Sequence, residues 1–174
     1  FFAHAGLDNR LWKDMRRVFE APSDKTKLEF VDEVLSHWVA QARKDIGFNR
    51  NIELLNAGWD RGGMQQVGGI NWVDFSNFSP VQGINQIVGH TPHRIPDVKI
   101  QKQGGAITVK DIFEYQDVKN FPACQDPLSI NYALDTHSKH YIVIEDGEVQ
   151  VWDFIHNMNV KDLKDYAIPE SPLS

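Results

Sequence analysis

The sequence predicts an α/β protein, and two patterns carry the prediction. From Asp8 to Phe48, apolar residues recur every three or four positions, which is the spacing of amphipathic helices. Later, short runs rich in β-branched and aromatic residues are separated by turn-forming residues, and the last such runs form a hairpin. The chain has 174 residues and shows no internal repeat or second hydrophobic core. We therefore expect one unit over residues 1–174.

Two helices are expected before residue 48. Asp8 can cap the first helix, and Pro22 ends its apolar periodicity. Ser23 is a candidate cap for a second, longer helix, for which Gly47 is a plausible stop. The charged residues on the other face of the second helix predict a solvated surface.

A glycine-rich region from Gly58 to Gly89 lacks helical periodicity, and strands are expected at the start of the chain, at the end of this region and beyond it. The expected strands cover residues 1–4, 84–89, 132–135 and 141–152, with shorter ones around the Gly104-Gly105 turn. Asp146-Gly147 predicts a tight hairpin turn within the last of these. We expect mainly one sheet, helices 8–48 outside it, and a frayed tail over residues 159–174.

Composition excludes several classes of function. Lys and Arg total 18 against 24 Asp and Glu, a net charge of −6, so a general nucleic-acid binder is not expected. No run approaches the length of about 20 apolar residues that spans a membrane, and no signal peptide is visible. Cys124 is the only cysteine, which excludes an intrachain disulfide and a cysteine-based zinc site. These features fit a cytoplasmic protein. The apolar start at Phe1, without Met, suggests a fragment or a processed chain.

Two predicted strands end in a histidine beside a small residue. The first is Phe2-Ala3-His4-Ala5-Gly6, and the second is Ile87-Val88-Gly89-His90-Thr91-Pro92-His93. Ligands of α/β sheets bind at the carboxyl ends of strands, and imidazole is a common ligand of transition metals. A single histidine there is more often a hydrogen-bonded core residue. With two histidines at matching positions, a metal site and a structural role are equally good hypotheses.

The ordered set of motifs resembles the C-terminal half of a calcineurin-like metallophosphoesterase, in the bacterial and phage serine/threonine phosphatase branch. The resemblance rests on His4-Ala5-Gly6, on the strand end Gly89-His90-Thr91-Pro92, on Leu134-Asp135-Thr136, and on the closing hairpin from Tyr141 to Trp152. It covers nearly the whole chain. It implies a partial metallophosphoesterase fold, a sandwich of mixed β-sheets flanked by helices.

The resemblance also implies an activity and a set of roles. His4 and His90 match the two histidines that bind one metal ion of a dinuclear pair. Two divalent metal ions would then hold the hydroxide that attacks phosphorus, with manganese most suitable and iron or zinc also fitting. The substrate would be a phosphoprotein or a small phosphoester. Arg61 is the candidate phosphate-binding arginine, and a surface ion pair is its alternative role.

The sequence departs from the family in three respects. The family's N-terminal half, which supplies the other metal motifs, is absent, so we expect it as a missing partner. His93 follows His90 at a spacing that prevents a safe assignment to the metals. His137 stands where relatives of this branch usually have glycine, and it is a candidate catalytic residue facing the metals or the substrate.

Other readings remain open. The aromatic residues Trp72, Phe75 and Phe78 can shape a substrate groove but fit core packing better, and the role of Asp74 among them is undecided. The chain can also be a non-catalytic fragment or degenerate relative that serves as an interaction module. In a third reading, the helical segment 8–48 docks a partner.

Overall fold

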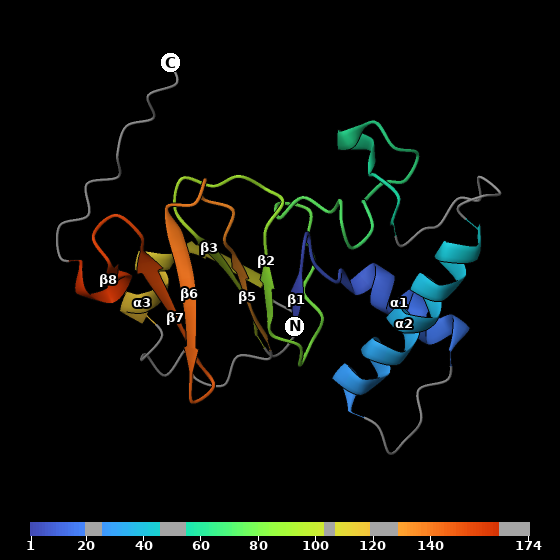
Figure 1. The fold of residues 1–174 in the computed structure, drawn as a ribbon, viewed down its shortest axis with the longest axis horizontal. Coiled ribbons are helices and arrows are strands. Elements are labelled where there is room, and N and C mark those ends of the chain that lie inside the picture. The colour runs from blue at the N-terminus through green and yellow to red at the C-terminus, as the bar shows by residue number, and fades with distance from the viewer. Residues whose placement is uncertain (20–25, 46–54, 103–106, 119–128, 164–174) are drawn as a thin grey trace.

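The computed structural model describes residues 1–19, 26–45, 55–102, 107–118 and 129–163 (Figure 1). Within them the chain forms a five-stranded mixed sheet, a three-stranded antiparallel sheet and three α-helices. The predicted α/β class is confirmed at this level. Of the residues described, no helix has the length and apolar character needed to cross a membrane.

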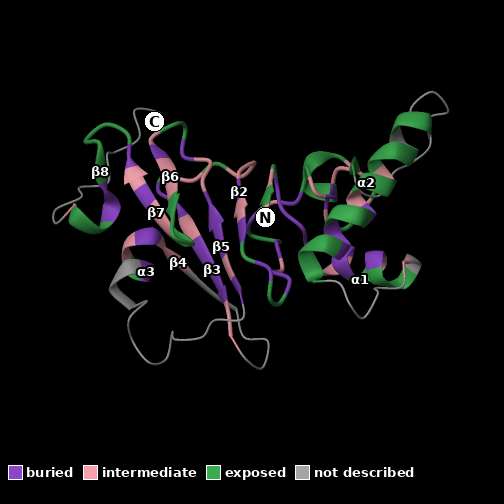
Figure 2. Cartoon of the chain, turned by 60° about the horizontal axis from the view of Figure 1, so that its bottom comes forward, coloured by how far each residue is buried: buried purple, intermediate pink, exposed green. Residues whose placement is uncertain are grey.

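The larger sheet brings three parallel strands side by side. Its order is β1-β2-β5-β3-β4, where β1 is Phe2–Ala3, β2 is Gln86–Val88, β5 is Ser129–Ala133, β3 is Asp97–Gln101 and β4 is Ile107–Asp111. β1 and β5 both run parallel to β2, and β3 runs antiparallel to β5 and β4. Ala3, Val88 and Ala133 lie in register, so the chain leaves all three parallel strands at the same edge. β5 is buried along most of its length (Figure 2).

The first two helices follow the sequence prediction closely. α1 spans Asn9–Val18, and the carboxylate of Asp8 caps it by accepting a hydrogen bond from the amide of Arg10. α2 spans Lys27–Asp45, and a capping box between Thr26 and Glu29 starts it. Ser23, Pro22 and Gly47 lie outside the described residues. The apolar faces of both helices share one core with residues near β2, and the helices stand beyond the β1 edge of the sheet (Figure 1).

The closing hairpin was expected in the main sheet, and that expectation is wrong. β6 (His140–Glu145), β7 (Glu148–Asp153) and β8 (Met158–Asn159) form a separate sheet. Its turn is the predicted Asp146-Gly147, with φ of 49° and 80° as a tight two-residue turn requires. The inner face of the hairpin packs on the core of the larger sheet, through Ile142, Val149 and Val151. Packing face to face buries these side chains, which lateral pairing would leave exposed.

Two further features were not predicted correctly. A third helix, α3 (Ile112–Val118), follows β4, and Ile112 is fully buried beneath the small sheet. The expectation of a frayed tail from residue 159 is wrong for its first residues. Asn159 lies in β8, and Val160 starts a 3-10 turn through Asp162 with only 1% of its surface exposed. Burial of Val160 holds this segment in place, and residues 164–174 lie outside the described part.

Candidate functional site

The carboxyl ends of the three parallel strands border an open cleft of about 610 Å³. Its lining comes from the strand ends of β1, β2 and β5 and the residues just after them: Phe2, Ala3, His4, Ile87, Val88, Gly89, His90, Leu134 and Asp135. Both histidines singled out from the sequence therefore lie in one cleft, together with one carboxylate. The parallel register of the strands explains this convergence, because the chain leaves all three strands at the same level.

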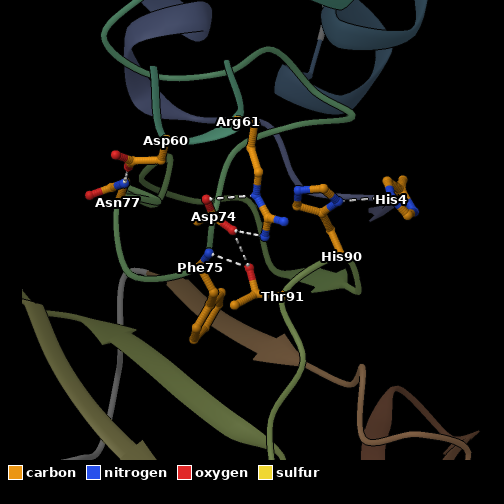
Figure 3. Close-up of polar contacts among 8 residues, drawn as sticks. All are labelled: His4, Asp60, Arg61, Asp74, Phe75, Asn77, His90 and Thr91. Carbon is orange, nitrogen blue, oxygen red and sulfur yellow. Dashed lines mark hydrogen bonds and ion pairs between the residues drawn. The ribbon is translucent and has the colours of Figure 1, made fainter. Parts of the chain in front are cut away.

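His4 and His90 are in direct contact. Nε2 of His4 lies 3.0 Å from Nδ1 of His90, and the two rings meet edge to face (Figure 3). The backbone supports this arrangement, since the amide of Gly89 donates to the carbonyl of His4 over 2.8 Å. His90 has a left-handed backbone with φ of 70°, which is uncommon for a residue with a side chain. Such backbone strain is concentrated at functional sites.

The surroundings of His90 favour its neutral form. Burial lowers its pKa below the usual value, and the positive charges of Arg61 and His4 lower it further, while Asp74 and Asp135 oppose them. Neutral imidazole is the form that binds metal ions. Within the described residues, the buried Nε2 of His90 has no hydrogen-bond partner. The other nitrogen, Nδ1, is the one that faces His4.

The His4–His90 separation fits two ligands of one metal ion. With metal–nitrogen bonds of about 2.0–2.1 Å, two nitrogens at neighbouring coordination positions lie about 2.9–3.4 Å apart. The observed 3.0 Å falls in this range, and it is also the length of the hydrogen bond that joins the two rings in this structure. Across the described residues, however, no group of three or more His, Cys, Asp or Glu side chains is arranged to hold a metal ion. A metal site at this pair would therefore need further ligands.

Arg61 lies beside this pair on a tight turn. It ends the 3-10 turn Trp59–Arg61, where the amide of Gly63 donates to the carbonyl of Gly58. A Cβ atom at Gly63 would stand 1.8 Å from the carbonyl oxygen of Ala57, so only glycine fits there. A second link fixes the turn, because Asn77 donates a hydrogen bond of 2.9 Å to Asp60 (Figure 3).

Asp74 holds the Arg61 side chain. Nε and Nη2 of Arg61 donate to the two carboxylate oxygens over 3.2 and 2.5 Å. The hydroxyl of Thr91 lies 3.4 Å from the same carboxylate, and it accepts a 2.7 Å hydrogen bond from the amide of Phe75. Arg61 lowers the pKa of Asp74, mainly through the hydrogen bonds, so the carboxylate stays ionised. Thr91 directly follows His90, and this network joins the arginine to the histidine loop.

Lys99 on β3 anchors the segment that carries Asp74. Its ammonium donates to the backbone carbonyls of Phe75, Ser76 and Phe78, and it lies 4.9 Å from the ring centre of Phe75. The residue is only 5% exposed, and burial lowers the pKa of its ammonium to about 8. No pattern in the sequence indicates this anchor, because a lysine in a strand usually points to solvent.

The three aromatic residues of this segment divide between two roles. Phe75 and Phe78 are buried and stacked in the core, in keeping with the packing alternative. Trp72 is 41% exposed, and its ring contacts that of His90 edge to face, with centres 5.7 Å apart. Trp72 therefore forms part of the wall beside the histidines.

The structure does not bring the two other candidate histidines, His93 and His137, to the His4–His90 pair. Nδ1 of His93 lies 3.0 Å from a carboxylate oxygen of Asp97, and the ring packs edge to face on Phe75. His137 is exposed in the turn after β5, with a left-handed φ of 54°, and it does not line the cleft. Its catalytic role stays a prediction. Cys124 lies outside the described residues.

Comparison with protein-family models, with curated proteins and with solved structures finds no match for this chain.

Proposed function

We propose that this chain carries part of the site of a metal-dependent phosphoesterase, a hydrolase of phosphoric monoesters. One observation carries the proposal: two imidazole nitrogens, 3.0 Å apart, lie at the ends of neighbouring parallel strands. That position is where α/β sheets bind ligands, and that spacing suits two ligands of one metal ion. The expected substrate is a phosphorylated protein or a small phosphoester.

Each residue of the site has a distinct task in this proposal. His4 and His90 hold one metal ion of a pair, with manganese preferred and iron or zinc also suitable. When bound, divalent metal ions supply activation of water and neutralise charge on phosphoryl oxygens. Arg61 offers the N–H groups that Asp74 leaves free to a phosphoryl oxygen. Trp72 forms the wall along which a leaving group would lie.

Further metal ligands would come from outside the described residues. The resemblance to calcineurin-like metallophosphoesterases implies an N-terminal half that supplies them, and we propose such a half as the partner of this chain. Asp135, which follows β5 and lines the same cleft, is a carboxylate candidate on the chain itself. Its negative charge favours a cation at this edge of the sheet.

Manganese-dependent hydrolysis of p-nitrophenyl phosphate tests the activity, with the chain alone and with an added N-terminal half. We expect His4→Ala, His90→Ala and Arg61→Ala each to reduce the rate at least 100-fold. His37→Ala is the matched control, because His37 is exposed on α2, and it should leave the rate unchanged. Full activity in His90→Ala would contradict the proposal.

A second candidate function is a non-catalytic interaction module. It is favoured by the fact that no three His, Cys, Asp or Glu side chains of the described residues are arranged to hold a metal ion. This reading predicts no hydrolysis with manganese, iron or zinc, even after an N-terminal half is added. It also predicts that His90→Ala leaves binding of that half unchanged.

A further inference from the structure

The guanidinium of an arginine has five N–H hydrogens that can donate hydrogen bonds. In Arg61, two of them donate to Asp74. Asp74 takes the Nε–H and one hydrogen of Nη2. The Nη1 group and the second hydrogen of Nη2 stay free of Asp74. These free donors lie at the outer end of the planar guanidinium, where a phosphoryl group can be gripped by two of them.

Contacts of Asp74 with its neighbours fix the position of the free end of the Arg61 guanidinium. The Arg61 guanidinium lies between Asp74 and the ring of His90 (Figure 3). Asp74 is also linked to Thr91, the neighbour of His90. Lys99 ties the backbone just after Asp74 to the sheet at three carbonyls. The Asp74 carboxylate is thus held in place by Thr91 and by the anchored backbone. Without Asp74, the Arg61 side chain, which is 38% exposed, would be free to rotate.

We propose that Asp74 is a positioning residue that turns the free end of the Arg61 guanidinium toward the His4–His90 pair, where it receives a phosphoryl group. The phosphate-binding part rests on the proposed function; the orientation of Arg61 does not. A positioning role for Asp74 and a purely electrostatic role predict opposite effects on phosphate binding when the carboxylate is removed. A carboxylate beside an anion site should weaken anion binding, so its removal should strengthen it. If Asp74 positions Arg61, its removal should weaken binding.

Asp74→Asn keeps the shape of the side chain and removes its charge. Asp60→Asn is the matched control, because Asp60 precedes Arg61 on the same turn and its hydrogen bond goes to Asn77, not to the guanidinium; the amide oxygen of asparagine can still accept that bond. The first measurement is the exchange of the Arg61 Nε–H with water by NMR, with the signal assigned by its absence in Arg61→Lys. We expect slow exchange in the wild type and in Asp60→Asn, and exchange at least about 10-fold faster in Asp74→Asn.

The second measurement is the affinity for inorganic phosphate by calorimetry, with and without zinc. Loss of charge-assisted hydrogen bonds should weaken binding about 10- to 100-fold in Arg61→Ala. We expect Asp74→Asn to weaken it about 5- to 10-fold and Asp60→Asn not to weaken it. In the Arg61→Ala background, Asp74→Asn should cause no further loss, since the group that it positions is gone.

Two results would overturn the positioning role: unchanged Arg61 Nε–H exchange in Asp74→Asn, or phosphate binding that is equal or tighter in that variant. A different result would count against the proposed function alone. If the wild type and Arg61→Ala bind phosphate equally, Arg61 is not a phosphate ligand. The exchange measurement then still decides whether Asp74 orients it.

Discussion

Replacing Gln86 by methionine should destabilise the protein strongly, although the residue contacts no ligand. Gln86 lies in β2 with 1% of its surface exposed, and its amide group bridges the backbone of Leu7. The side-chain oxygen accepts from the Leu7 amide over 2.8 Å, and the side-chain nitrogen donates to the Leu7 carbonyl over 3.0 Å. Methionine has a similar volume and fits an apolar site, so the variant isolates the two hydrogen bonds.

The magnitude follows from the two backbone groups left without partners. Each unsatisfied buried group costs about 1–3 kcal/mol, which gives a loss of about 2–6 kcal/mol for the two groups. That is a large part of the roughly 5–15 kcal/mol by which a domain is stable. For a chain of this size, 3 kcal/mol corresponds to a decrease in Tm of about 6–12 °C. The bridged segment directly follows His4-Ala5-Gly6, so the histidine loop should loosen as well.

Urea unfolding followed by circular dichroism measures the effect, and thermal unfolding provides a second readout. Gln66→Met is the matched control, because Gln66 is exposed, and it should change the free energy of unfolding by less than about 0.5 kcal/mol. A loss below about 1 kcal/mol in Gln86→Met would show that Gln86 does not satisfy the Leu7 backbone groups. It would refute the view that this bridge holds the segment after His4 against β2.

Two further predictions concern the loop that carries Arg61 and Asp74. Because burial lowers the pKa of Lys99 to about 8 from 10.5, its contribution to stability is present above pH 10.5 and is lost as the pH falls to 8. The free energy of unfolding of the wild type should therefore rise by about 2 kcal/mol from pH 7.5 to 9.5, relative to that of Lys99→Met. If the free energies of unfolding of the two proteins change equally with pH, the ammonium is not buried. Gly63→Ala places a Cβ atom 1.8 Å from the carbonyl oxygen of Ala57, so it should cost about 1–3 kcal/mol and accelerate exchange of the Arg61 Nε–H. Gly62→Ala meets no atom within 4 Å and pays only for its left-handed backbone, about 1 kcal/mol; if it costs more than Gly63→Ala, the steric argument fails.

The parts of the fold that depend on local signals were predictable from the sequence. Asp8 caps α1 as expected, and Asp146-Gly147 forms the hairpin turn, because both are short-range effects of side-chain and backbone chemistry. His4 and His90 could be expected to meet, because both follow apolar strands. Their contact at 3.0 Å agrees with that reasoning, whereas their metal role stays a prediction.

The parts that depend on long-range packing were not predictable. No local sequence signal indicates that β6 and β7 form a sheet of their own. Their separate sheet depends on the burial of Val151 against the larger sheet. Val160 lies in a segment that ends in proline-rich sequence, yet it fills the same core. The Arg61–Asp74 pair spans 13 positions across a glycine-rich loop without periodicity, so only the folded loop reveals it.

The most direct test of the central claim is a calorimetric titration of the chain with Mn²⁺. If His4 and His90 are ligands of one metal ion, binding should occur with one ion per chain, and His4→Ala and His90→Ala should each weaken it at least about 10-fold. His137→Ala should bind as the wild type does, because His137 lies outside the cleft. Equal binding by the wild type, His4→Ala and His90→Ala, or no binding even with an N-terminal half added, would contradict the assignment of a metal site to this histidine pair.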